Sequence, residues 1–167
     1  DVRAEGGTLE LARDAEGRPE RLHLAGSPAR IDLPSDGEAG ARRAVADEFE
    51  ATLVSGTLRR LTIPGSLSIL ESAPASRPGS RTPAAARRLS AGSGQLGFGP
   101  DGRTIETAVL DGGVALSEGT ATSIRAPRAT LRGEDESAVF AGSAETPARY
   151  EDAEARVAAT ILTWYRK

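Results

Sequence analysis

The chain has 167 residues, of which 38% are hydrophobic and only 4% aromatic. This length predicts one domain over residues 1–167, and the polar composition predicts sheets with one face in water. The 21 basic and 24 acidic residues give a net charge of −3, which offers no support for a nucleic-acid-binding surface. Cysteine is absent from the sequence, which excludes disulfides, thiolate zinc sites and cysteine nucleophiles.

Apolar residues alternate from the beginning of the chain. Asp1 leads almost at once into such a run, so we expect a trimmed or mature end, and no stretch approaches the roughly 18 apolar residues of a membrane span. Alternation through Leu22 and Leu24 changes parity before Ile31, the next large apolar residue. A strand that changes parity must kink or bulge, so we predict a bend at residues 26–28.

The clearest strand signal runs from residue 58 to residue 69. Pro64 in its middle removes a backbone donor, which predicts a sheet edge or a bend at that point. Two segments rich in Ala and Arg, 38–49 and 83–89, are each predicted to form a short turn of helix. Residues 71–88 hold three prolines and no apolar side chain larger than Ala. That composition predicts a mobile loop inside the domain.

Two hairpins are predicted further along the chain. The sequence Gly-Pro-Asp-Gly at 99–102 favours a tight turn, and Glu118-Gly119 joins two alternating strands, the second of which shifts parity at Pro127. A glycine heading a short alternating strand recurs at positions 26, 65, 112 and 142, at intervals too uneven for a fixed-period solenoid. The sequence therefore predicts an all-β, antiparallel fold.

Residues with catalytic or metal-binding chemistry are sparse. His23, the single histidine, alternates with two leucines, which predicts a solvent-facing strand residue rather than a catalytic base. The acidic clusters at 47–50 and 134–136 suggest either a calcium or magnesium site or solvated turns, and their spacing matches no calcium loop. We therefore predict solvated turns, with no catalytic residue, metal site or cofactor.

Arginine accounts for every basic residue except Lys167, and three adjacent pairs stand out, at 42–43, 59–60 and 87–88. Scattered surface charge is the default interpretation of such pairs. If the pairs gathered at one rim, their guanidinium groups would suit phosphate oxygens.

Several segments share one pattern of glycine, alternating strand and polar turn. These are GSPARIDL at 26–33, GSLSILES at 65–72, GGVALSEG at 112–119 with the following SIRAPRATL, and the closing run 139–165. The pattern resembles the OstA-like family of lipopolysaccharide-transport proteins, which includes the LptA and LptC types. The resemblance covers most of the chain outside residues 71–88, a segment longer than the family pattern leads us to expect.

The resemblance implies an antiparallel sheet folded over on itself, a β-jellyroll or β-taco with an apolar groove open along one side. It further implies a periplasmic bridge or adaptor, without catalytic residues or cofactors, that carries lipopolysaccharide acyl chains toward the outer membrane. The implied partners are lipopolysaccharide or a related lipid and other OstA-like domains, a copy of this chain included, joined end to end by strand pairing.

The residues expected to bind lipid share large apolar side chains at alternating strand positions. They are Leu22, Leu24, Ile31, Phe49, Leu61, Ile63, Leu67, Ile69, Phe98, Leu110, Val114, Leu116, Ile124, Leu131 and Phe140. The scarcity of aromatic side chains favours a cavity over a filled core.

Two alternatives remain open at this stage. The same apolar residues would pack against each other in a purely structural β-repeat domain with a solid core. A carbohydrate-binding jelly roll would need aromatic side chains that stack on sugars, for which few are available. The sequence also leaves open whether the chain is a bridge subunit, a membrane-anchored component or part of a larger protein.

Overall fold

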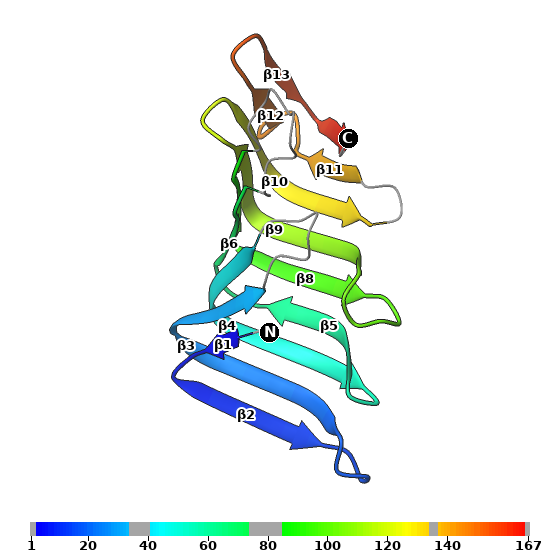
Figure 1. Cartoon of the computed structure of the whole chain (residues 1–167). Coiled ribbons are helices and arrows are strands. Elements are labelled where there is room, and N and C mark those ends of the chain that lie inside the picture. The colour runs from blue at the N-terminus through cyan, green and yellow to red at the C-terminus, as the bar shows by residue number, and fades with distance from the viewer. Residues whose placement is uncertain (1–2, 34–40, 74–84, 134–136, 166–167) are drawn as a thin grey trace, which may run out of the picture.

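The computed structural model describes residues 3–33, 41–73, 85–133 and 137–165 (Figure 1). All its regular elements are β-strands, joined antiparallel into one 14-stranded sheet, so the predicted all-β, antiparallel class is confirmed. The strands are β1 (Arg3–Glu5), β2 (Thr8–Arg13), β3 (Pro19–Leu33), β4 (Arg42–Val54), β5 (Thr57–Ile63), β6 (Leu67–Glu71), β7 (Arg87–Ala91), β8 (Ser93–Phe98), β9 (Ile105–Glu118), β10 (Thr122–Arg132), β11 (Ser137–Ala141), β12 (Ala148–Glu151), β13 (Arg156–Ala159) and β14 (Ile161–Tyr165). In Figure 1 they stack from blue β2 at the bottom to β13 at the top.

The sheet is folded over into two leaves that share four long strands, β3, β4, β9 and β10. One half of β4, residues 42–46, pairs with β6, and its other half, residues 50–54, pairs with β5. We call the leaf that contains β2, β5, β8, β11 and β14 the β2–β14 leaf. The β1–β13 leaf contains β1, β6, β7, β12 and β13, and each long strand contributes one half to each leaf. This is the folded-over double sheet that the family resemblance implied.

The fold line between the leaves follows glycine and proline. The β3–β4 register breaks between Ala25 and Ala29, around the cis Ser27-Pro28 bond, and the β9–β10 register breaks between Ala126 and Arg128. Proline has no backbone N–H to donate, so the pairing is interrupted where the strand has to turn. Both parity shifts seen in the sequence are therefore confirmed as bends.

The recurring glycines lie on the same fold line. Gly65 lies in the corner between β5 and β6, beside Pro64, whose predicted bend is confirmed. At another corner, Gly92 and Gly112 pack backbone against backbone: a Cβ added at Gly92 would lie 2.8 Å from the Gly112 oxygen. Gly112 also has a φ of 79°, which side chains rarely allow. Glycine is required there because the two strands approach more closely than a methyl group permits.

Three local predictions are wrong or need new limits. Residues 42–49 are strand, not helix, because they pair with β3 on one side and, over residues 42–46, with β6 on the other. The helical turn predicted at 83–89 is also wrong from Arg87 onward, where β7 begins. The loop predicted at 71–88 is shorter at both ends, since β6 includes Glu71; its centre, 74–84, lies outside the described residues.

The core lies along the inside of the fold line. Its largest fully buried side chains are Phe49, Phe140, Ile63, Leu110 and Val114. Alanines fill the remaining inner positions next to the bends, and several of them have no exposed surface. Small side chains at the corner allow the two leaves to approach each other there, so the core is narrow and follows the bend.

Candidate functional site: an apolar groove between the two leaves

The candidate groove is the space between the inner faces of the two leaves, where the apolar cluster lies. All fifteen residues predicted to line it belong to the apolar cluster found there. The buried members are Leu24, Phe49, Ile63, Leu67, Leu110, Val114, Ile124 and Phe140, and the half-buried ones are Leu22, Ile31, Leu61, Ile69, Phe98, Leu116 and Leu131. They pack in one apolar cluster, and contact of any of them with lipid remains a prediction.

Burial decreases from the fold line toward the mouth. Leu67 is 2% exposed, whereas Ile69, the next inward residue of β6, is only half-buried. Val114 and Leu116 repeat this order along β9. The floor of the groove is therefore packed with protein atoms, while its walls keep apolar surface within reach of a ligand.

Sequence reasoning missed part of the lining. Leu89, Leu96 and Leu162 face the same cluster, and so do Tyr150 and Trp164 near the end of the chain. The sequence did contain a signal for them. Leu89 and Ala91 are separated by the polar Ser90, and Leu162 and Trp164 by the polar Thr163, as in a strand with one apolar face. The Tyr150 hydroxyl donates a hydrogen bond to Asp152, and this bond raises the pKa of Tyr150.

Inward-facing charges form a row at the rim of the β1–β13 leaf. We call this row the rim ladder: Arg42, Glu71, Arg87 and Glu118 lie opposite one another on β4, β6, β7 and β9. Arg42 Nε is 3.6 Å from Glu71 Oε1, and Arg87 Nη2 is 3.0 Å from Glu118 Oε1. Basic and acidic groups alternate along the row, so each charge has an opposite neighbour where the apolar wall ends.

One contact of the rim ladder crosses the groove. The Arg87 guanidinium lies over the indole of Trp164, with Cζ 5.7 Å from the ring centroid. Arg87 belongs to β7 of the β1–β13 leaf and Trp164 to β14 of the other leaf. The two walls therefore touch at the mouth through a cation–π pair.

The apolar lining continues to both ends of the sheet. On edge strand β2, Leu9 and Leu11 pair with Leu24 and Leu22, so they share the inward face, yet they are 62% and 44% exposed. On edge strand β13, Val157 pairs with Tyr150 and is 45% exposed. The groove thus has apolar surface at each open end.

Comparison with known proteins agrees with this geometry. No family model and no curated protein matches the sequence. A solved structure does match: LptH of Pseudomonas aeruginosa, the LptA-homologous periplasmic component of its lipopolysaccharide transport device, has a TM-score of 0.56 over 100% of this chain and 96% of that one. The chain has the fold of LptH. Because the two sequences are only 7% identical, the predicted family resemblance is confirmed at the level of the fold.

The charged residues singled out in the sequence lie outside the groove or at its rim. His23 faces outward from the LptH-like sheet, as predicted, with Nε2 2.8 Å from Glu48 Oε1 and Nδ1 3.7 Å from Glu10 Oε2. The solvated turn predicted at 47–50 is wrong, since these residues belong to β4, and 134–136 lie outside the described residues. In the part that the structure describes, no cluster of acidic or histidine side chains is able to hold a metal ion.

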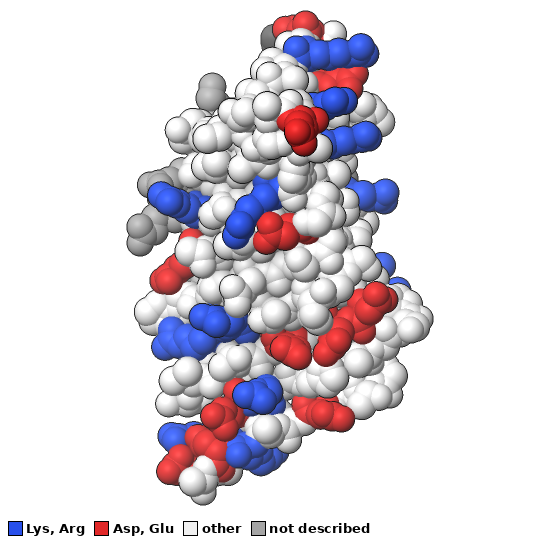
Figure 2. All heavy atoms as spheres, turned by 180° about the vertical axis from the view of Figure 1, so that it is seen from behind, with Lys and Arg blue, Asp and Glu red and all other residues white. Residues whose placement is uncertain are grey.

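The three arginine pairs do not gather at one rim. Arg42 and Arg87 face inward on the rim ladder. Arg43, next to Arg42, faces outward and forms an ion pair with Asp32, with 2.7 Å between Arg43 Nε and Asp32 Oδ1. This ion pair lowers the pKa of Asp32. The pair at 59–60 belongs to β5 of the opposite leaf. Seen from behind, basic and acidic groups are interspersed over the surface rather than gathered into one patch (Figure 2).

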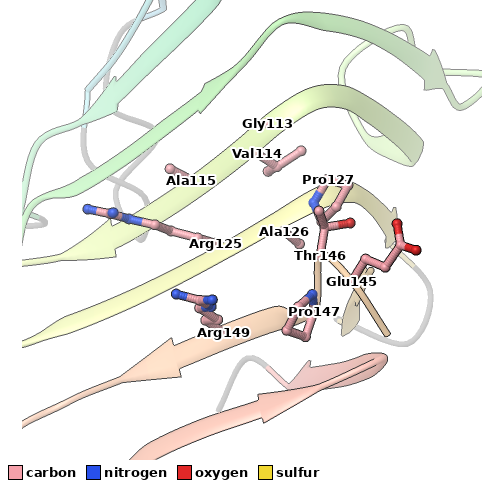
Figure 3. Close-up of a pocket in the computed structure, with 10 residues that line it drawn as sticks. All are labelled: Gly113, Val114, Ala115, Arg125, Ala126, Pro127, Glu145, Thr146, Pro147 and Arg149. Carbon is pink, nitrogen blue, oxygen red and sulfur yellow. The ribbon is translucent and has the colours of Figure 1, made fainter. Parts of the chain in front are cut away.

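A shallow hollow of about 410 Å³ lies where the LptH-like sheet bends at Gly113 and Pro127 (Figure 3). Arg125 and Arg149 lie directly opposite each other on β10 and β12 at its edge, with Glu145 on the connecting segment. Both arginines are exposed and alternate with buried inward residues. The hollow therefore opens on the outer side of the sheet, and its lining includes Val114 and Ala126 of the apolar cluster. None of the described elements is a helix long and apolar enough to cross a membrane.

Proposed function

We propose that this protein is a periplasmic, lipid-binding bridge or adaptor that carries lipopolysaccharide acyl chains along its groove toward the outer membrane. The observation that carries the proposal is the burial gradient on the inner faces: a packed floor below apolar walls that remain half-buried. The likeness to LptH supports the periplasmic location and the link to lipopolysaccharide transport.

An acyl chain gains most where apolar wall is still accessible. Burial of each methylene contributes about 0.8 kcal/mol, so a chain lying along several wall residues binds without any charged contact. Leu22, Leu61 and Leu131 provide such surface on one leaf, and Ile31, Ile69 and Leu116 provide it on the other. These residues and the other nine predicted ones are the proposed lipid contacts.

The open ends support the bridge role. Among the described residues, β2 pairs only with β3 and β14 only with β11, and unpaired backbone groups accept a further strand. A second OstA-like domain, or another copy of this chain, added at such an edge would cover Leu9 and Leu11 and extend the groove. We propose end-to-end strand pairing as the mode of assembly.

The aromatic side chains argue against a carbohydrate-binding jelly roll. Phe49 and Phe140 are buried in the core, and the guanidinium of Arg87 covers the Trp164 ring. Among the described aromatic residues, Tyr165 alone is exposed, at 65%. Sugar stacking needs an exposed ring face.

A solid structural core is disfavoured because the side chains of the walls become less buried toward the mouth. The four charged groups of the rim ladder pair with one another, which supports a transport role rather than a catalytic one.

The test compares two neighbouring residues of β6 that point to opposite sides. Ile69 faces the groove and is half-buried, whereas Leu70 faces outward and is 38% exposed. We expect Ile69→Ser to weaken binding of the fluorescent fatty acid cis-parinaric acid about tenfold, and Leu70→Ser to leave it unchanged. Purified lipopolysaccharide should displace the probe from the wild-type protein. Equal effects of the two substitutions, or no binding by the wild-type protein, would refute the proposed function.

A further inference from the structure

The contact between Arg87 and Trp164 is unusual because it joins the two leaves at the mouth of the groove. Elsewhere the leaves are connected through the long strands and the packed floor. Arg87 and Trp164 lie on the same inward face as Leu89 and Leu162 of their own strands. Their side chains therefore meet above the apolar walls, between the groove and solvent.

The neighbours of Arg87 hold its side chain in this position. Its Nε and Nη2 both donate to Glu118 Oε1, at 3.3 and 3.0 Å, and Glu71 lies opposite on β6. The side chains of Arg87 and Glu118 are 27% and 35% exposed, so the pair is partly screened from water. A guanidinium held by a carboxylate along one edge keeps its flat face available for stacking on the indole.

We propose that Arg87 is the gate residue of the groove, a role that rests on the proposed lipid-binding function. Its contact with Trp164 holds the mouth closed over the C-terminal half of the groove. An acyl chain enters or leaves sideways there only after the guanidinium separates from the indole. Toward the N-terminal end, beside exposed Leu9 and Leu11, no such cation–π contact joins the two leaves among the described residues, and the mouth of the groove stays open there.

A gate makes a specific kinetic prediction. Opening precedes both entry and exit, so loss of the contact should speed association and dissociation together and change the equilibrium affinity little. A residue that merely contacts the bound lipid behaves differently, because its loss speeds dissociation only and weakens the affinity. The ratio of the two rate changes therefore separates a gate from a wall contact.

The protein carries its own reporter, since Trp164 is its single tryptophan. In ligand-free protein, we expect Arg87→Ala to raise the quenching of Trp164 by acrylamide about twofold. Arg88→Ala is the matched control, because Arg88 is the outward-facing neighbour on β7, and it should quench like wild type. Circular dichroism and urea unfolding verify that each variant is folded.

Stopped-flow mixing with cis-parinaric acid then measures the gate directly. We expect Arg87→Ala to raise both rate constants about tenfold, the factor that corresponds to about 1.4 kcal/mol, within the range of a partly desolvated cation–π pair. Arg87→Lys, which keeps the charge but not the flat fork, should give intermediate rates and serves if the alanine variant does not fold. Combining Arg87→Ala with Trp164→Leu should add no further acceleration.

Each outcome decides between the proposals. Unchanged rates in Arg87→Ala, or faster dissociation alone, would overturn the gate and leave lipid binding standing. A double variant faster than either single one would show that the two residues act separately, which also overturns the gate. If the wild-type protein takes up no probe, the proposed function fails and the gating role fails with it, whatever the quenching shows.

Discussion

Replacing Gly92 by alanine tests whether the sharp corner of the sheet positions the two walls. Gly92 lies between β7 and β8, one strand in each leaf, and it faces Gly112 in the bend of β9. Its N–H donates to the Asp111 oxygen at 2.8 Å, so the two backbones are already in contact. The substitution adds one methyl group where neighbouring backbone occupies the space.

The size of the effect follows from the distances. The added Cβ would lie 2.8 Å from the Gly112 oxygen and 3.0 Å from its Cα, and both neighbours are backbone atoms that no rotamer change moves away. Overpacking of this kind costs about 1–3 kcal/mol. For a chain of this size, 1 kcal/mol corresponds to about 2–4 °C in Tm, so the middle of that range, about 2 kcal/mol, predicts that Gly92→Ala lowers the Tm by about 4–8 °C.

Gly65→Ala is the matched control. Gly65 is also a corner glycine, but its added Cβ would meet only Asp47 Oδ2, at 3.6 Å, which is an ordinary contact. Thermal unfolding followed by circular dichroism should show Gly65→Ala within about 2 °C of the wild-type Tm. A Gly92→Ala protein as stable as Gly65→Ala would refute the inference that the corner is closed too tightly for a side chain.

Three further predictions follow from other parts of the molecule. Val114→Asp or Ile63→Asp places an unpaired charge at a site no more than 1% exposed. Urea unfolding should show a loss of about 3 kcal/mol or more in unfolding free energy, and cis-parinaric acid binding should disappear. A folded double variant that binds like wild type would contradict the assignment of the inner face. Asp101 accepts bonds from the Thr104 hydroxyl and nearby backbone N–H groups, which lowers its pKa from 3.8 to about 2. Its folded-state pKa is below its unfolded value, so its contribution is complete above pH 4 and lost as the pH falls toward 2. The urea midpoints of wild type and Asp101→Asn should therefore differ at neutral pH and converge between pH 4 and 2, whereas a constant difference would contradict this role. Finally, Leu9→Asp should weaken end-to-end association measured by analytical ultracentrifugation while leaving the Tm within about 2 °C, because Leu9 is 62% exposed; unchanged association would exclude the β2 edge as the contact.

Alternation in the sequence was sufficient to assign the inner face, because a strand with one wet side repeats its polarity every two residues. Breaks in that alternation also located the bends at residues 26–28 and at Pro127. The strand at 42–49 was missed, since its alanines and arginines are good helix formers and only pairing with β3 and β6 decides its conformation. At these residues, pairing with neighbouring strands outweighs the local helix propensity.

The contact between Arg87 and Trp164 was beyond sequence reasoning for a related reason. Parity places both side chains on the inner face, but it carries no information about which strands of the opposite leaf lie within reach. The rim ladder was hidden for the same reason, because its neighbours come from strands that are not consecutive, such as β4 with β6 and β7 with β9. Chain order alone does not determine these pairings.

The corner shared by β3, β4, β9 and β10 limits which changes of sequence the fold tolerates. Each wall needs only alternating polarity, a requirement that many sequences meet equally well. One residue inserted at the corner would instead shift the parity of the following strand and turn its apolar side chains toward water. The walls are therefore expected to tolerate substitutions that keep the alternation, and the corner is expected to tolerate no inserted residue. This chain and LptH share a fold at 7% identity, as expected of an architecture that depends on alternating polarity and on the position of the bend rather than on particular residues.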